Sequence, residues 1–335
     1  MSTPTSLRLP DGVRRTSIET SHTTFAALEA LPGTGVCERQ PALLVPGYTG
    51  SKEDFLSVLH QLAAAGRRVI AIDMRGQYET PGPADPRCYA IERLGADIAD
   101  IISAIAARAA GTPSAGAGPS PGYGVHVLGH SFGGLVAREA LLGNAEGICS
   151  LTLMSSGPAA LTGPAAARLG GLLAQLDDGG SAGPGMLRYR IERLWDGQAG
   201  PQAATPAVSD GIAAFLRDRM LRNSPAGLWA MGSYLLTAPD RTAELAQRAE
   251  VPVLVVYGED DDTWEPAAQE EMAARLGAER VCIPGAAHSP AVEAPETTAS
   301  ALNAFWQAAE AVASEGGREM AQMARAGWPA GWDGA

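Results

Sequence analysis

Short apolar runs alternate with amphipathic segments along most of the chain, and this alternation restricts the fold more than any other feature. Runs at 42–45, 125–128 and 148–154 have the length of buried strands, and the segment 91–109 repeats apolar residues at helical spacing. Strands that alternate with helices form a mostly parallel sheet with helices on both faces, so we expect an α/β fold. Further strands are expected at 14–20, 24–28 and 68–72, the first two at an edge of the sheet.

The strand pattern pauses in the middle of the chain and then resumes. Between 158 and 249 the sequence is typical of helices and loops, and strand-like runs return at 251–257 and 280–283. A sheet that pauses and then continues indicates a core domain that carries an inserted helical lid. We therefore expect a first core segment at 1–157, a lid at 158–249, a second core segment at 250–313 and a flexible tail at 314–335.

Charge and cysteine usage exclude several classes of partner. The formal net charge is −12 at pH 7, which argues against nucleic acid because phosphate binding needs a basic surface. No apolar run resembles a signal peptide or a membrane span, so a cytoplasmic protein without a membrane partner is expected. Cys37, Cys88, Cys149 and Cys282 lie far apart, which favours buried thiols over disulfides or a metal site.

The pattern Gly-x-Ser-x-Gly occurs three times, and its surroundings distinguish the copies. A nucleophilic serine in this pattern needs a strand before it and a helix after it, so that its hydroxyl stands exposed on a sharp turn. The copies centred on Ser120 and Ser181 have neither. The copy at 129–133 (Gly-His-Ser-Phe-Gly) follows the expected strand 125–128 and precedes a helical segment. We therefore expect Ser131 to be a catalytic nucleophile.

A serine hydroxyl is a weak nucleophile and needs an adjacent base. The chain has five histidines, and four of them (His22, His60, His126 and His130) lie beside or within expected strands, helices or the serine turn itself. His288 differs, because it follows the last expected strand in a loop of small residues. Such a loop lies at the carboxyl edge of a parallel sheet, where it can reach the serine. His288 is the predicted general base.

The acid that orients the base should follow a strand between Ser131 and His288. The expected strand 251–257 runs into Gly-Glu-Asp-Asp-Asp at 258–262, whereas the loop after the preceding strand, 155–157, has no carboxylate. The pattern alone leaves the choice among these acidic residues open.

Together these stretches resemble the α/β-hydrolase superfamily, and in particular its lid-bearing serine hydrolases. The order Ser, Asp, His along the chain is the order found in that superfamily. The resemblance covers about 41–306 outside the expected lid. Its matching motifs are 46–50 (Pro-Gly-Tyr-Thr-Gly), 73–76 (Asp-Met-Arg-Gly), the serine turn 129–133, 258–261 (Gly-Glu-Asp-Asp) and 285–288 (Gly-Ala-Ala-His).

The resemblance implies which carboxylate completes the triad. In the family the acid usually stands three residues after the glycine that ends the strand, which corresponds to Asp261. A proline that follows in the family would suit Asp262 instead, because Pro266 stands one residue late. We expect Asp261 to be the acid, with Asp262 as the alternative.

The resemblance also implies an oxyanion hole of two backbone N–H groups. They correspond to Phe132, after the nucleophile, and Tyr48, after Pro46-Gly47. Many family members have His-Gly where this chain has Pro46-Gly47, but the backbone donor is unaffected by that difference.

The expected activity is cleavage of a carboxylic ester or a related acyl bond of a small molecule through an acyl-serine intermediate, without a cofactor. Thioesters, lactones, carbon–carbon bonds next to ketones and a perhydrolase reaction use the same residues. Epoxide hydrolases and haloalkane dehalogenases carry aspartate where Ser131 stands and are disfavoured. A small-molecule receptor of the same fold is the alternative from another class. Large side chains of the expected lid would either wall an acyl pocket or fill the core of the lid: Trp195, Phe215, Trp229, Met231 and Tyr234.

Overall fold

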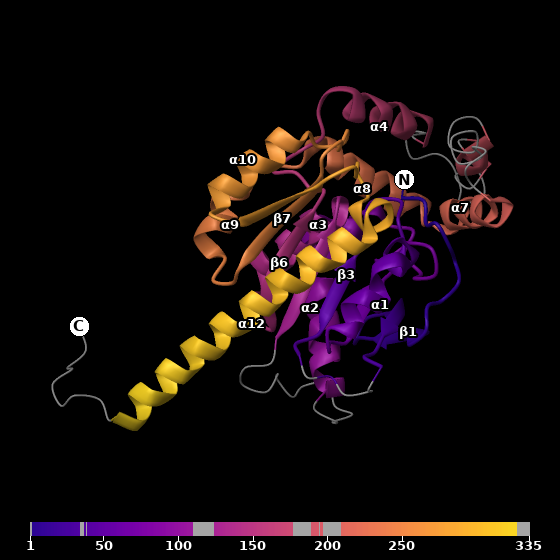
Figure 1. Cartoon of the computed structure of the whole chain (residues 1–335). Coiled ribbons are helices and arrows are strands. Elements are labelled where there is room, and N and C mark those ends of the chain that lie inside the picture. The colour runs from indigo at the N-terminus through magenta and orange to yellow at the C-terminus, as the bar shows by residue number, and fades with distance from the viewer. Residues whose placement is uncertain are drawn as a thin grey trace.

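The computed structural model describes residues 2–33, 37, 39–109, 124–176, 189–193, 195–196 and 209–326. Within them, eight strands form one sheet in the order β1-β2-β4-β3-β5-β6-β7-β8 (Figure 1). Neighbours from β4 to β8 pair in parallel, whereas β1 and β2 are antiparallel to their neighbours. The expected α/β sheet is therefore confirmed. The strands are Val13–Glu19 (β1), Thr24–Ala30 (β2), Ala42–Val45 (β3), Val69–Ile72 (β4), Val125–His130 (β5), Ile148–Met154 (β6), Val253–Gly258 (β7) and Glu279–Ile283 (β8).

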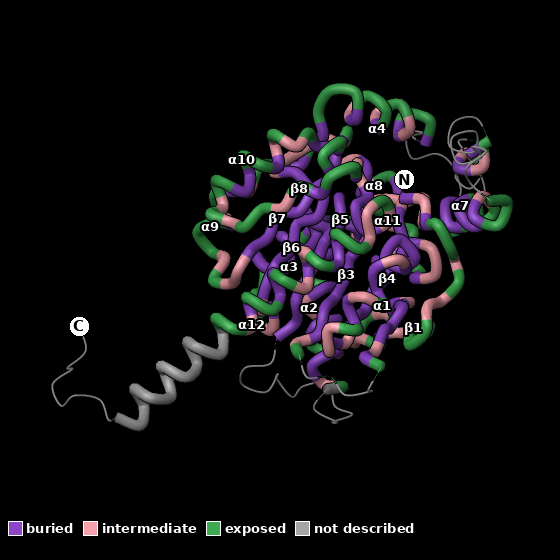
Figure 2. The backbone as a smooth tube through the Cα atoms, in the orientation of Figure 1, coloured by how far each residue is buried: buried purple, intermediate pink, exposed green. Residues whose placement is uncertain are grey.

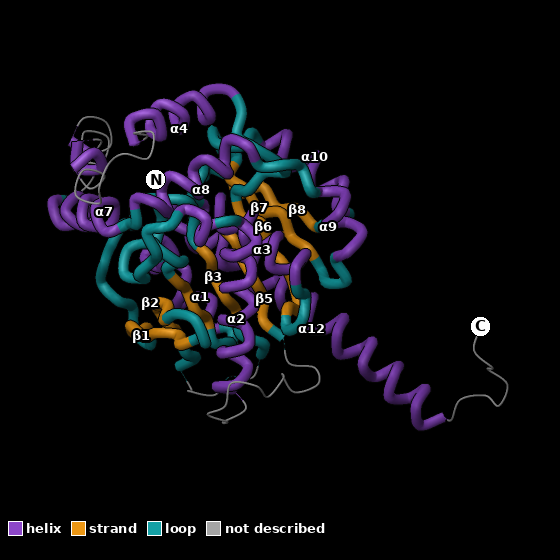
Figure 3. The backbone as a smooth tube through the Cα atoms, turned by 180° about the vertical axis from the view of Figure 1, so that it is seen from behind, coloured by secondary structure: helices purple, strands orange, loops and turns teal. Residues whose placement is uncertain are grey.

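Helices cover both faces of the sheet (Figures 1 and 3). On one face α2, α3, α9 and α10 pack together, and on the other α1 packs against α12 and α11. The core helices and short 3-10 helices are Lys52–Phe55 (η1), Leu56–Ala64 (α1), Pro86–Tyr89 (η2), Ile91–Ala109 (α2), Phe132–Gly143 (α3), Thr242–Arg248 (α9), Pro266–Leu276 (α10), Pro290–Glu293 (α11) and Pro295–Ala326 (α12).

The central strands are buried throughout, because both of their faces are covered, and they are mostly apolar. Every residue of β3, β4, β5 and β7 is buried, and Figure 2 shows these strands in the middle of the molecule. In β3, Leu43 and Val45 belong to the cluster under α2 and α3, whereas Ala42 and Leu44 belong to the cluster under α1 and α12. Successive side chains thus serve opposite layers, as a strand requires.

The segment between β6 and β7 contains helices and no strand among its described residues. Three of these helices lie at the carboxyl edge of the sheet: Gly163–Leu176 (α4), Asp210–Arg222 (α7) and Pro225–Thr237 (α8). α4 packs against α8. The fourth, α9, was expected to belong to the lid, but it packs between α3 and α10 and extends the core layer.

The carboxyl-terminal helix is longer than expected. α12 continues to Ala326, although a flexible tail was expected from residue 314. Alanine, glutamate, arginine and methionine are frequent in its last turns, and these residues favour a helix even without packing. No helix in the described part of the chain is long and apolar enough to cross a bilayer.

A buried ionic cluster joins α12 to the sheet. Glu310 accepts hydrogen bonds from Arg67 Nη1 at 2.8 Å and from His126 Nε2 at 3.1 Å. The side chain of Arg67 is fully buried, so Glu310 supplies the opposite charge that it needs. Burial lowers the pKa of His126, which is therefore an uncharged hydrogen-bond partner of Glu310.

The expectation of buried thiols is wrong for all four cysteines. They are free, as expected, but Cys37 and Cys282 are exposed and Cys88 and Cys149 are half-buried. Cys282 lies on β8, the edge strand of the sheet, where one side of the strand has no neighbour.

Candidate active site

Ser131 lies on the sharp turn between β5 and α3. Its backbone has φ 55° and ψ −121°, a strained conformation for a residue with a side chain. Its amide donates to the carbonyl of Met154 on the neighbouring strand at 2.8 Å, which fixes the turn against the sheet. A side chain at Gly129 would collide with the carbonyl of Gly133, so the close approach of strand and helix requires glycine there.

The structure brings Ser131, His288 and Asp261 into one chain of hydrogen bonds. His288 Nε2 lies 3.0 Å from Ser131 Oγ, and His288 Nδ1 lies 2.9 Å from Asp261 Oδ1. Asp261 follows β7 and His288 follows β8, so both loops lie at the carboxyl edge of the sheet beside the serine turn. Asp262, the alternative acid, is 70% exposed and pairs with Arg168 at 3.3 Å. The geometry favours Asp261 over Asp262.

The carboxylate of Asp261 is held from three directions. Besides its contact with His288, it accepts hydrogen bonds from the amide of Thr263 at 3.0 Å and from Nε2 of Gln269 at 3.0 Å. Gln269 is buried on α10 and also donates to the carbonyl of Trp264. Burial alone would raise the pKa of Asp261, but the bonds from His288, Thr263 and Gln269 outweigh it and the pKa is lowered. The carboxylate therefore stays ionised.

Gln269 was not anticipated from the sequence. It lies within an ordinary amphipathic helix, and nothing in the pattern indicates that its amide turns toward the loop after β7.

His130 was not expected to act as the base, but it contacts the loop that carries His288. Its Nε2 donates to the backbone carbonyl of His288 at 2.7 Å, and its side chain is buried. Burial and the neighbouring His288 lower the pKa of His130 to about 3, so the ring is neutral. His130 thus joins the serine turn to the His288 loop through an uncharged hydrogen bond.

The turn at 46–48 lies directly against the serine. A Cβ on Gly47 would be 3.1 Å from the Cβ of Ser131, so the residue before Tyr48 lies close to the serine. The amide of Phe132 is the first of α3, and the opening N–H groups of a helix have no acceptor within it. The two residues expected to supply the oxyanion hole, Tyr48 and Phe132, therefore belong to segments next to Ser131.

Gln77 holds this turn in place, a role that no sequence pattern indicates. Its Nε2 donates to the carbonyls of Gly47 at 2.8 Å and Tyr48 at 3.1 Å. The Tyr48 hydroxyl donates to the carbonyl of Leu228 on α8 at 2.7 Å, which connects the turn to the helical insertion. Gln77 and α8 together fix the turn that lies next to the serine.

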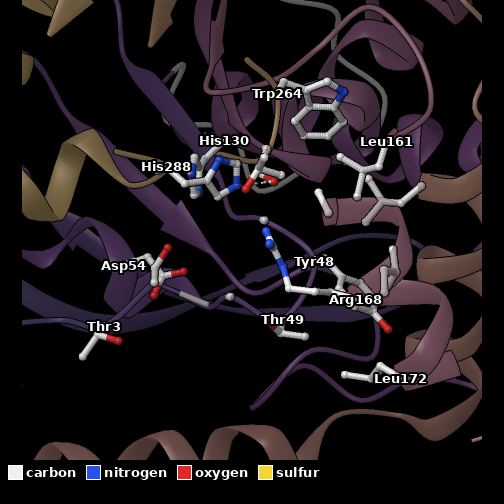
Figure 4. Close-up of a pocket in the computed structure, with 18 of the residues that line it drawn as sticks. Thr3, Tyr48, Thr49, Asp54, His130, Leu161, Arg168, Leu172, Trp264 and His288 are labelled. Atoms are coloured by element: carbon white, nitrogen blue, oxygen red, sulfur yellow. Dashed lines mark hydrogen bonds between the residues drawn. The ribbon is translucent and has the colours of Figure 1, made fainter. Parts of the chain in front are cut away.

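A cavity of about 370 Å³ opens above Ser131 and His288 (Figure 4). Its wall comes from the turn at 46–50, the loop after β7, the helices α4, α7 and α8, and residues 2 and 3. In the described part of the chain, no cluster of three or more His, Cys, Asp or Glu could hold a metal ion.

For the large side chains of the insertion, two alternatives were open, the pocket wall and a hydrophobic core, and none of the five lines this cavity. Trp195, Phe215 and Met231 are buried in the hydrophobic core instead, and Trp229 is 41% exposed. Tyr234 packs edge-to-face against Phe132.

Two large aromatic side chains line the cavity: Tyr48, from the turn at 46–50, and Trp264, from the loop of Asp261, which was not anticipated. Leucines of the insertion supply most of the remaining apolar wall.

Comparisons with known proteins agree with this fold. Residues 42–301 match the family described as "Alpha/beta hydrolase family". A stretch of 122 residues is 32% identical to "Putative carbamate hydrolase RutD" of Variovorax paradoxus, covering 36% of this chain and 40% of that protein. The chain is also similar to "Putative 2-succinyl-6-hydroxy-2,4-cyclohexadiene-1-carboxylate synthase" of Bacillus subtilis, at 23% identity over 82% of this chain and 93% of the relative.

Among solved structures, one reported for a "putative lipase" of Acinetobacter baumannii has a TM-score of 0.67 at 20% identity, covering 90% of this chain and 93% of that one. Because the family match covers most of the chain and the sheet has the expected order of strands and site loops, this chain belongs to the alpha/beta hydrolase family.

Proposed function

We propose that the protein hydrolyses a carboxylic ester, or a closely related acyl bond, of a small molecule through an acyl-serine intermediate. The observation that carries the proposal is the continuous chain of hydrogen bonds from Ser131 through His288 to Asp261 at the floor of an open cavity. A nucleophile, a base and an orienting acid in this arrangement are what acyl transfer requires.

In the first half of the reaction, His288 Nε2 takes the proton of Ser131 Oγ as this oxygen attacks the carbonyl carbon. The carbonyl oxygen becomes an oxyanion, which the amides of Tyr48 and Phe132 stabilise. Collapse of this intermediate breaks the bond to the leaving alcohol, which receives the proton from His288, and leaves the acyl group on Ser131.

In the second half, water replaces the alcohol. His288 takes a proton from the water as it attacks the acyl-serine, and then returns a proton to Ser131 Oγ as the carboxylic acid leaves. Asp261 remains ionised throughout and stabilises the positive charge that His288 carries in each transition state, in agreement with its lowered pKa.

We further propose that α4, α7 and α8 act as the lid of this site. Residues of all three helices line the cavity, and the Tyr48 hydroxyl bonds to α8. Substrate selection would then depend on the insertion rather than on the triad. Thioesters, lactones and carbon–carbon bonds next to ketones stay within the proposal, because they use the same groups at the same positions.

Turnover of a panel of p-nitrophenyl esters and acyl thioesters by the wild-type protein and Ser131→Ala tests the proposal. Ser181→Ala is the matched control, since Ser181 lies in a second copy of the same motif. We expect hydrolysis that is lost in Ser131→Ala and retained in Ser181→Ala. Stoichiometric binding or labelling without turnover would instead favour a receptor of the same fold.

A further inference from the structure

The two sides of the cavity differ in chemistry. Its apolar lining residues come mainly from the insertion and the loop after β7: Leu161, Ala165, Leu169, Leu172, Leu235 and Trp264. Its polar lining residues include Ser2, Thr3, Thr49 and Asp54. Figure 4 shows Thr3 and Asp54, which mark a polar side of the cavity, well apart from Leu161 and Leu172. Ser131 and His288 line the same cavity.

The polar side is a fixed part of the structure, because residue 2 is anchored at both its side chain and its backbone. Ser2 is buried, and its Oγ lies 2.8 Å from the Oγ of Ser289, the residue after the proposed base. Its carbonyl accepts a hydrogen bond from Arg219 Nη2 at 2.8 Å. These contacts hold Thr3 in the wall of the cavity.

The polar side also carries little net charge. Asp54 Oδ1 accepts a hydrogen bond of 2.6 Å from Arg219, whose side chain is fully buried and supplies the opposite charge. A carboxylate paired in this way still has lone pairs that can accept from a hydroxyl. Thr3 and Thr49 add hydroxyl groups that both donate and accept. Such a surface suits an uncharged hydroxylated group better than an ammonium or a carboxylate, since either ion would disturb the existing pair.

The one other charged side chain among the lining residues is Arg168, on α4. It is 59% exposed and pairs with Asp262, so it lies at the solvent-exposed rim.

We infer that the bond cleaved at Ser131 joins an apolar hydrocarbon part to a small, uncharged part that bears hydroxyl groups, and that Thr3 and Asp54 contact the hydroxylated part. This inference rests on the proposed ester hydrolysis. It assigns to residues 2 and 3 a role in substrate selection that no motif in the chain indicates.

Two pairs of esters of matched size test the inference. The first pair is 2,3-dihydroxypropyl butanoate and propyl butanoate, in which the hydroxyl groups lie on the alcohol. The second is butyl 2,3-dihydroxypropanoate and butyl propanoate, in which they lie on the acyl part. Measuring kcat/KM for both pairs covers either orientation of the substrate in the cavity.

Three variants isolate the contribution of the wall. Thr3→Val keeps the shape of the side chain but loses its hydroxyl, and Thr3→Ser keeps the hydroxyl. Thr5→Val is the matched control, because Thr5 is exposed in the same segment and does not line the cavity.

In one of the two pairs we expect the wild-type protein to prefer the dihydroxylated ester. Thr3→Val should reduce that preference about fivefold, the usual effect of one lost hydrogen bond, while Thr3→Ser and Thr5→Val retain it. The inference is overturned if neither pair shows the preference, or if Thr5→Val reduces it as much as Thr3→Val does. If none of the four esters is cleaved in a Ser131-dependent way, the proposed function fails as well; Ser131-dependent cleavage without the preference overturns this inference alone.

Discussion

Replacing Asp261 with asparagine removes one charge from the site and leaves its shape unchanged. The two carboxylate oxygens divide their partners: Oδ1 accepts from Thr263 N and faces His288 Nδ1, and Oδ2 accepts from Gln269 Nε2. An asparagine side chain has one acceptor and one donor group, so it cannot serve both sides. Keeping the oxygen toward His288 directs its NH₂ group at the donor of Gln269, and turning it the other way directs the NH₂ group at His288.

The expected loss of activity follows from the role of the carboxylate in the transition state. The same change of acid to amide in serine proteases lowers kcat about 10⁴-fold, which corresponds to about 5 kcal/mol of transition-state stabilisation. We expect Asp261→Asn to lose kcat by a factor of this order. The mismatched donor pair should lower the free energy of unfolding by only about 1–3 kcal/mol, so the protein stays folded.

The assay is steady-state hydrolysis of an activated ester, with Asp262→Asn as the matched control one residue away. The side chain of Asp262 is 70% exposed and pairs only with the exposed Arg168, so the control should change kcat by less than about threefold. Circular dichroism and thermal melting serve to check that both variants are folded. A larger loss in Asp262→Asn than in Asp261→Asn would refute the geometry described for the site and transfer the role to Asp262.

Three further outcomes are expected. His130→Ala removes the donor to the His288 carbonyl, so kcat should fall about tenfold with little change in KM. His130→Gln retains a donor and should retain part of the rate. Equal losses of kcat in both variants would contradict the role of that bond. Burial raises the pKa of Glu310, but hydrogen bonding from His126 and the charge of Arg67 outweigh it and lower the pKa to about 2. The ionised Glu310 therefore stabilises the folded protein above pH ~4, and this stabilisation is lost as the pH falls toward 2. Glu310→Ala should therefore cost about 3 kcal/mol of unfolding free energy near neutral pH and flatten the fall in melting temperature between those pH values; an unchanged denaturation midpoint would show that the cluster is not stabilising. Leu169→Trp narrows the cavity at its apolar wall and should reduce kcat/KM for octanoyl relative to butanoyl esters. Trp229→Ala alters a side chain outside the cavity and should leave that ratio unchanged. The reverse result would place the acyl pocket elsewhere.

Periodicity and local motifs were sufficient to predict the sheet, because buried parallel strands leave long apolar runs and the serine turn requires a strand, glycines and a helix in fixed order. They also placed Ser131 and His288 on loops that the structure brings together, whereas the choice of Asp261 came from the family resemblance. Each of these residues lies within five residues of the end of a strand, and the carboxyl ends of parallel strands meet at one edge.

The supporting contacts could not be predicted, because they depend on side-chain direction across elements distant in the sequence. Gln77 and Gln269 lie in segments with no distinguishing pattern, yet their amides turn toward the turn at 46–48 and the loop of Asp261. For a similar reason, the sequence could not decide whether the large side chains of the helical insertion line the pocket or fill a core. Composition shows that they are apolar but not whether they face the cavity, the helix core or solvent, as the exposure of Trp229 illustrates.

The central claim is that Ser131 is the nucleophile and that His288 activates it. Reaction with a fluorophosphonate probe, followed by peptide mapping, tests this claim directly. We expect one adduct per chain, located on Ser131, with labelling abolished in Ser131→Ala and slowed by orders of magnitude in His288→Ala, both proteins being folded. An adduct at Ser120 or Ser181, or labelling that persists in Ser131→Ala, would contradict it.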